Sequence, residues 1–444
     1  LTVVLARLML LSPVFFGLSG IFSVVLQSYQ LFFVYALAPI LYNLGIVLGI
    51  VVLVPIFGIY GLGMGVVLGA VAHFLLQFAA AARRGFGASN GLNSVGPKLA
   101  QTEFRPKPVA GIRRVLFLSF PRVLAISLNQ LTVMVLVAIG SLLAEGSVAI
   151  FSAAQDLYFV PVGIFGVSYA VAIFPRLSRA AALGSGADFL QELFVGVRSI
   201  LFWVAPSAAL FLVLRAHVVR VALGAGAFSW EDTRLTAAVL AALAVAMAAA
   251  ALQTLLIRGF YALGNTRVPL AVSAGTSIFS VGLAWVLTAA LGSGSEFSRG
   301  AAALFRIADL PHPEVLGLGI AFAAGLIINA AALWVLLVRT AEARFGIRRE
   351  WRNGQIGKIV IAAIFAGIAG YLVRVSFSQT LPLITFVRVL VQGAVAAGAG
   401  FGAYWGILSF LGSPDVAALR RSAAQHLFSI GILPKHWGEE RENI

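Results

Sequence analysis

The chain has 444 residues, of which 61% are hydrophobic and only 11% are charged, and its formal net charge is +15. A soluble globular domain is about half apolar and about a quarter charged, so this composition excludes a soluble domain and makes lipid the solvent for most of the chain. The Lys and Arg residues gather in loops and at the ends of apolar runs. This pattern is typical of loops on the cytoplasmic side of a membrane and argues against a nucleic-acid partner.

The apolar runs are long enough to cross a bilayer as helices. A hydrocarbon core of about 30 Å needs about 20 apolar residues per helix, and runs without alternation favour a helical bundle over a barrel. We therefore predict an all-α polytopic membrane protein with about eleven spans. Their residue ranges are 2–26, 33–57, 60–82, 115–143, 147–175, 197–221, 234–258, 269–291, 314–338, 357–375 and 386–412.

The loops set the predicted orientation of these spans. Residues 83–114 and 339–356 are dense in Lys and Arg, and they lie on one side of the membrane if eleven spans alternate. The segment 413–444 falls on that same side. Because short cytoplasmic loops carry the excess of Lys and Arg, we predict that all three segments are cytoplasmic.

An internal repeat predicts how the spans group into lobes. The run "GLGMGVVLGA" from Gly61 resembles "GLGIAFAAGL" from Gly317, so the first three spans match the seventh to ninth. We expect residues 1–82 to be the last three helices of an N-lobe and 115–338 to be a C-lobe of six helices. Residues 357–412 would add two helices. On this reading the chain is N-terminally truncated from about fourteen helices, and repeated lobes are the architecture of secondary transporters.

Three stretches carry a resemblance to a known family. They are "SPVFFGLSGIFSVVLQSYQLFFVYALAPILYNLGIVLGI", "QDLYFVPVGIFGVSYAVAIFPRLSRAA" and "RGFYALGNTRVPL". These stretches resemble the MurJ (MviN) family of lipid II flippases, whose fold is shared with multidrug and oligosaccharide-lipid exporters. The middle motif, P-x-G-x-F-G followed by F-P-x-L-S-R, is the most specific.

The resemblance implies a fold, a substrate and a location. The expected fold is a two-lobe inverted-V transporter bundle in the bacterial cytoplasmic membrane. The expected activity is translocation of lipid II, the polyprenyl-pyrophosphate-linked glycopeptide lipid, from the inner to the outer leaflet by alternating access. Its partners would be that substrate and membrane lipids. Residues 357–412 would form a groove for the lipid tail, and the small residues from Gly393 to Gly406 would either line that groove or allow close helix packing.

Two ionisable residues inside predicted spans are the first candidates for a substrate site. Arg122 would lie about 10 Å deep from the cytoplasmic side, and Asp156 about 14 Å deep from the other side. Arg122 either reaches back to the interface, lines a cavity as a phosphate ligand or belongs to an ion pair. Asp156 either pairs with Arg122, binds an ion or proton, or faces a water-filled vestibule. Family members carry an arginine and a glutamate where this chain has Asp156 and Phe159, so the family's site is not intact here.

Three further residues are cavity candidates. Gln130 aligns with a family glutamine, and Asn43 is an amide within a span; interhelical hydrogen bonding is the alternative for both. Arg7 faces either a cavity or the membrane interface.

The sequence gives no reason to expect an enzyme. It contains no Walker loop, no H-E-x-x-H and no G-x-S-x-G motif. We expect no cofactor and no structural metal, and Na+ or H+ is a candidate coupling ion. The alternatives are a flippase for another lipid-linked polysaccharide, a cation-coupled drug exporter and a transport-inactive membrane scaffold.

Overall fold

The computed structural model describes residues 2–28, 31–83, 123–124, 127–224, 226, 228–346, 354–380 and 385–419. Every regular element within these ranges is helical. Ten described helices are long and apolar enough to cross a membrane, and a shorter apolar helix covers Ser127–Gly140. This shorter helix is the described part of the predicted span 115–143. The prediction of an all-α polytopic fold is confirmed.

Several predicted segments lie outside the described residues. They are most of the basic loop 83–114, residues 347–353 of the loop 339–356, and the tail from 420 onward. Arg122 is also outside. The cytoplasmic location of these segments and the role of Arg122 therefore stay predictions.

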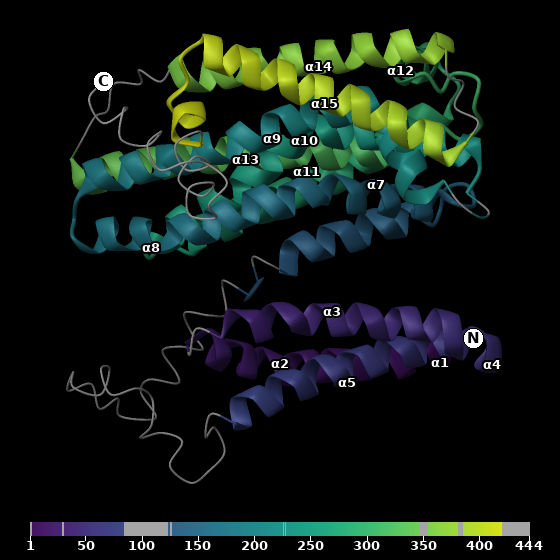
Figure 1. The fold of residues 1–444 in the computed structure, drawn as a ribbon, viewed down its shortest axis with the longest axis horizontal. Helices are drawn as coiled ribbons and strands as arrows, with labels where there is room; N and C mark the ends of the chain where they lie inside the picture. The colour runs from purple at the N-terminus through teal and green to yellow at the C-terminus, as the bar shows by residue number, and fades with distance from the viewer. Residues whose placement is uncertain are drawn as a thin grey trace, which may run out of the picture. The chain divides into compact units, whose positions relative to one another are not determined.

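The chain divides into two compact units, residues 1–111 and 112–444, and each is described by itself. The first unit contains α1 (Thr2–Met9), α2 (Leu11–Ser28), α3 (Phe32–Leu48), a π-helical turn (Gly49–Leu53), α4 (Val54–Phe57) and α5 (Tyr60–Ala82). Both α2 and α3 pack against α5 (Figure 1). The predicted span 2–26 is thus divided between α1 and α2.

Glycines set the close approach of α3 to α5. A Cβ atom added at Gly45 or Gly65 would collide with the backbone of the facing helix. Further along α5, polar pairs one helical turn apart join α2 to α5. Ser19 Oγ lies 2.8 Å from His73 Nδ1, and Ser23 Oγ donates to Gln77 Oε1 at 2.7 Å. Small residues and side-chain hydrogen bonds are the usual means by which helices associate in lipid.

The second unit is built around one central helix. In chain order it contains helix Ser127–Gly140, α7 (Ser147–Pro161), a π-helical segment (Val162–Val167), α8 (Ser168–Ala182), α9 (Gly186–Leu223), α10 (Trp230–Ala262), α11 (Arg267–Gly292), α12 (Glu296–Phe305), α13 (Val315–Phe345), α14 (Gly354–Thr380) and α15 (Phe386–Phe410). The Ala-rich α10 packs against α7, α8, α9 and α13, and α13 packs in turn against α11. Most of α10 is therefore buried inside the unit.

The P-x-G-x-F-G motif occupies the junction of α7 and α8. Its proline, Pro161, ends α7, and the next six residues form the π-helical segment. A Cβ atom added at Gly166 would approach Ala251 of α10 to 2.8 Å, and the Phe165 ring stacks on Trp203 of α9 with centroids 5.4 Å apart. The motif therefore joins α7 and α8 through a widened turn and seats them on α10 and α9. Single-turn π-helices are frequent at functional sites.

The last two helices, α14 and α15, pack against α9 (Figure 1). Tyr404 Oη of α15 donates to the Phe202 carbonyl of α9 at 2.6 Å. Ala396 is fully buried against Leu210 and Leu214 of α9. This face of α15 serves packing, whereas Gly398, Gly402 and Gly406 recur every four residues on its exposed face, where an added Cβ would meet nothing within 4 Å.

Candidate functional site

Asp156 is an exposed carboxylate in the middle of an apolar helix. It lies about 14 Å from the start of α7 at Ser147, and no ion pair joins it to another described residue. Gln130, on helix Ser127–Gly140, is also exposed, and no hydrogen bond joins the two side chains. A carboxylate at this depth does not face hydrocarbon without a large penalty, so this surface of α7 requires water or a cationic partner.

The other two candidates belong to the first unit. Arg7 on α1 and Asn43 on α3 are both exposed, and neither makes an ion pair with a described residue. Each unit is described by itself, so a site that Arg7 and Asn43 share with Asp156 stays a prediction.

A polar cavity of about 350 Å³ lies within the second unit. Helix Ser127–Gly140, α7, α10, α11 and α13 all contribute to its wall. Thr132 Oγ1 donates to Ser277 Oγ at 2.6 Å, and Asn329 Nδ2 donates to Thr276 Oγ1 at 2.8 Å. The first of these hydrogen bonds joins α11 to helix Ser127–Gly140, and the second joins α11 to α13.

Most of the polar groups in the lining of this cavity are uncharged hydroxyls and amides. Asn329 is only 3% exposed, and its Oδ1 atom has no hydrogen-bond partner among the described residues. Arg258 and Tyr261 of α10 also reach the wall, and none of the described lining residues is a carboxylate. The cavity can accommodate water, because buried polar atoms of this kind and a space of this size suit it.

Sequence reasoning did not identify this cavity. The signal was present in α11, where the hydroxyl residues follow the spacing of a single helical face. They are Ser273, Thr276, Ser277 and Ser280. A polar stripe of this kind inside an apolar span predicts a buried polar surface.

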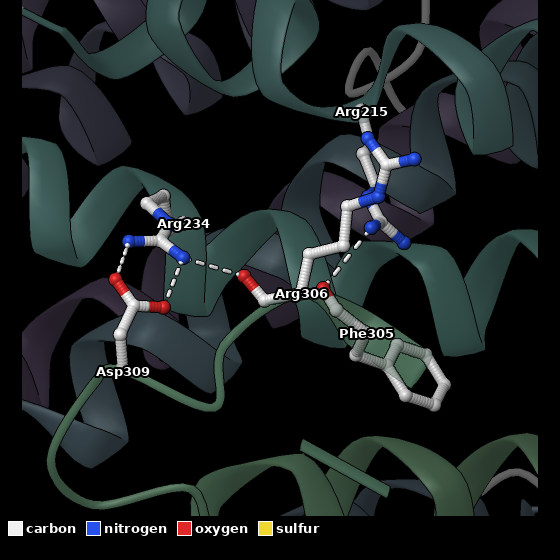
Figure 2. A network of polar contacts seen from close by, with 5 residues as sticks. All are labelled: Arg215, Arg234, Phe305, Arg306 and Asp309. Atoms are coloured by element: carbon white, nitrogen blue, oxygen red, sulfur yellow. Dashed lines mark hydrogen bonds and ion pairs between the residues drawn. The ribbon is translucent and has the colours of Figure 1, made fainter. Parts of the chain in front are cut away.

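A second polar network lies where α9 and α11 end. Arg234 of α10 donates to both carboxylate oxygens of Asp309 at 2.5 Å and to the carbonyl of Arg306 at 2.6 Å (Figure 2). Arg215 Nη2 of α9 donates to the carbonyl of Phe305 at 3.0 Å. The hydrogen bonds that Asp309 accepts from Arg234 hold the pKa of the Asp309 carboxyl below its ordinary value of 3.8. Together these contacts fix the chain that follows α12.

Comparison with known families decides the identity of the fold. The family described as "Lipid II flippase MurJ" matches residues 1–392 of the chain. The chain belongs to this family. Together with the ten candidate spans in the described residues, MurJ membership makes it a multi-pass protein of the bacterial cytoplasmic membrane.

Two curated relatives illustrate the extent of the similarity. The "Probable lipid II flippase MurJ" of Borreliella burgdorferi is 33% identical over 229 residues, which are 50% of this chain and 42% of the relative. The "Lipid II flippase MurJ" of Burkholderia cenocepacia is 27% identical over 282 residues, which are 63% of this chain and 52% of the relative. These matches span about half the length of each relative.

A solved structure shows the same fold. It is titled "Lipid II flippase MurJ, inward closed conformation" and matches with a TM-score of 0.62 at 20% identity, covering 91% of this chain and 74% of that one. The resemblance first drawn from the P-x-G-x-F-G motif is therefore confirmed at the level of family and fold.

The third MurJ-like stretch has a local structural explanation. In "GNTRVP" the Asn265 side chain accepts hydrogen bonds from the backbone N–H groups of Arg267 and Val268 at 3.1 and 3.2 Å. Gly264 has φ +72°, a conformation that suits glycine. The motif therefore ends α10 and caps the start of α11 within a few residues.

Proposed function

We propose that this protein translocates lipid II from the inner to the outer leaflet of the cytoplasmic membrane. The family match over residues 1–392 is the observation that carries the proposal. The relatives named above are described as lipid II flippases, and neither description supports another lipid-linked polysaccharide or an inactive scaffold. Translocation makes and breaks no covalent bond, so no enzymatic step is needed.

The physical problem for such a protein is to move a charged, sugar-bearing headgroup through hydrocarbon. A polar, hydrated surface between helices removes that penalty, and Asp156 supports one because an exposed carboxylate at mid-span needs water or a cation. In this proposal Arg122 supplies a guanidinium that is permanently charged and matches phosphate oxygens in shape. The apolar tail would stay in lipid beside α14 and α15.

The driving force is also part of the proposal. A membrane potential that is negative inside favours the outward movement of an anion by about 2.3 kcal/mol per charge per 100 mV. Coupling to Na+ or H+ is the alternative. Asp156 is the candidate for either ion, since the polar cavity of the second unit has no carboxylate in its described lining.

Complementation of a flippase-depleted bacterial strain tests the proposal. The gene is expressed in its full genomic reading frame as wild type, Arg122→Gln, Asp156→Asn and Arg176→Gln. Arg176 is 66% exposed and pairs with Glu192 at the surface, so it serves as a matched charge control. We expect wild type and Arg176→Gln to restore growth and the other two to fail. If cells with Arg122→Gln and cells with Asp156→Asn both grow at the wild-type rate, neither residue belongs to the transport site. If the wild-type protein is present in the membrane but does not restore growth, the proposed function is contradicted.

A further inference from the structure

Three arginines from three different elements converge at one end of the second unit. Arg215 lies on α9, Arg306 directly follows α12, and Arg374 lies on α14. The positive charges of Arg306 and Arg374 both act on the Arg215 guanidinium. Figure 2 shows the Arg306 side chain extending toward Arg215. We call these residues the three-arginine cluster.

No described carboxylate neutralises this cluster. The ion pairs recorded in the described residues join other basic groups to acids, as in Arg234 with Asp309 and Arg198 with Asp415. Among the described residues, Arg215 hydrogen-bonds only to the backbone carbonyl of Phe305, which leaves donors of its planar guanidinium available. Like charges gathered without a counter-charge repel one another, and an anion would relieve that repulsion.

The backbone around the cluster is held in place on both sides. Arg234 binds the Arg306 carbonyl and Asp309 together, and Arg306 is held at φ +62°, a left-handed conformation that glycine adopts far more easily. On the other side, His217 Nε2 and Gln392 Oε1 are 3.0 Å apart, and Gln392 Nε2 donates to the Arg374 carbonyl at 3.1 Å. A strained residue held by its surroundings points to a use for its side chain.

The depth of the cluster suits a lipid headgroup. Arg374 lies one residue before the end of the predicted span 357–375, and Arg215 lies about 9 Å before the end of the predicted span 197–221, so a long guanidinium side chain reaches the interface from both. The hydrocarbon core ends about 15 Å from the middle of a bilayer. Next to the cluster, Arg374 lies over the Tyr371 ring at 5.1 Å, and Tyr371, one turn away on the same face of α14, is 42% exposed. Positive charge that can bind a lipid headgroup therefore lies next to a surface that can contact the lipid tail.

We infer that Arg215, Arg306 and Arg374 bind the phosphate group of an anionic membrane lipid. Guanidinium groups recognise phosphate oxygens through paired, charge-assisted hydrogen bonds. The predicted orientation places the cluster at the outer leaflet, where an excess of arginine is not expected from loop charge alone. The inference needs only that the bundle lies in a bilayer, so it does not depend on the flippase function.

Thermal unfolding of the purified full chain tests the inference. Detergent micelles are titrated in separate series with phosphatidylglycerol, with phosphatidylcholine and with inorganic pyrophosphate. The variants are Arg306→Gly, Arg374→Gln and, as a matched control, Arg299→Gln, which removes an exposed arginine from the same α12. A ligand that binds only the folded state raises the unfolding temperature with its concentration.

In wild type and Arg299→Gln we expect a saturable rise with phosphatidylglycerol. The half-saturating concentration should be about tenfold higher in Arg306→Gly and Arg374→Gln, as the loss of one charge-assisted contact predicts. Without anion, Arg306→Gly should unfold at a higher temperature than wild type, because glycine relieves the left-handed backbone; this separates loss of binding from loss of folding.

The three ligand series identify the source of the phosphate. A response to phosphatidylglycerol that exceeds those to phosphatidylcholine and pyrophosphate supports an anionic lipid. A response to pyrophosphate of equal affinity that is lost in the same variants supports a phosphate site but assigns it to the free anion. Equal responses in Arg299→Gln, Arg306→Gly and Arg374→Gln, or no saturable response to either anion, would overturn the inference.

Discussion

Arg234 and Asp309 form a bidentate ion pair between α10 and the loop that follows α12. Both guanidinium Nη atoms lie 2.5 Å from a carboxylate oxygen, and Arg234 Nη2 also binds the Arg306 carbonyl at 2.6 Å. A planar fork that makes three hydrogen bonds to one loop fixes its geometry better than a single contact does. This pair therefore determines where Arg306 of the three-arginine cluster is presented.

The first prediction concerns the pH dependence of this pair. Because Arg234 lowers the pKa of Asp309 below 3.8, the ionised form is favoured by folding. The stability it confers is fully present above 3.8 and is lost as the pH falls through the lowered pKa. We expect the difference in unfolding temperature between wild type and Asp309→Asn to stay constant from about pH 5 to about pH 8 and to shrink only at lower pH. A difference that vanished between pH 5 and 8 would contradict the assignment.

Asp415, which follows α15, should behave in the opposite sense. Burial raises its pKa above 3.8, and the positive charge of Arg198, whose Nε atom lies 3.0 Å away, offsets this only in part. Its contribution is fully present below 3.8 and is lost as the pH rises through the raised pKa. We expect the unfolding temperature of wild type to fall relative to that of Asp415→Asn as the pH rises from about 4 to about 7. Parallel curves for the two proteins would show that Asp415 is not desolvated.

The hydrogen bond from Thr132 to Ser277 gives a prediction for the polar cavity. Thr132→Val keeps the side-chain volume but removes bonds to Ser277 and to the Leu128 carbonyl. The control Thr340→Val removes only the corresponding bond within its own helix, to the Leu336 carbonyl. We expect Thr132→Val to lower the free energy of unfolding by about 1 kcal/mol more than the control does. Equal losses in a denaturation experiment would mean that the interhelical bond contributes nothing.

Much of this architecture could be predicted from the sequence, because lipid imposes a simple pattern on apolar runs. The predicted span 234–258, which lies within α10, is recognisable from its length and composition alone. The position of a side chain around a helix is harder to predict. The small residues from Gly393 to Gly406 could either line a groove or allow close packing, and only the structure shows that Ala396 is fully buried against α9. The cluster of Arg215, Arg306 and Arg374 also could not be predicted, since its members are far apart in sequence and meet only through packing.

The exposed glycines of α15 give a prediction for the proposed tail groove. Gly402→Leu places a side chain in open space, whereas Ala396→Leu forces one into a packed contact. We expect Gly402→Leu to fold stably and to bind long-tailed substrate more weakly than wild type, while a short-tailed analogue binds as before. Ala396→Leu should lose about 1–3 kcal/mol of stability instead. If Gly402→Leu weakens both analogues to the same degree, or neither, this face of α15 does not hold the tail.

The most direct test of the central claim measures lipid II in the outer leaflet. Cells that depend on this protein, expressed in its full genomic reading frame, are exposed to an added hydrolase that cleaves lipid-linked pyrophosphate but cannot cross the membrane. The account predicts that cleaved lipid II appears in wild-type cells at the rate of synthesis and falls at least tenfold in Asp156→Asn cells with equal protein in the membrane. Intact lipid II should then accumulate inside. Equal cleavage in cells with and without the protein would contradict the assignment of lipid II translocation to this chain.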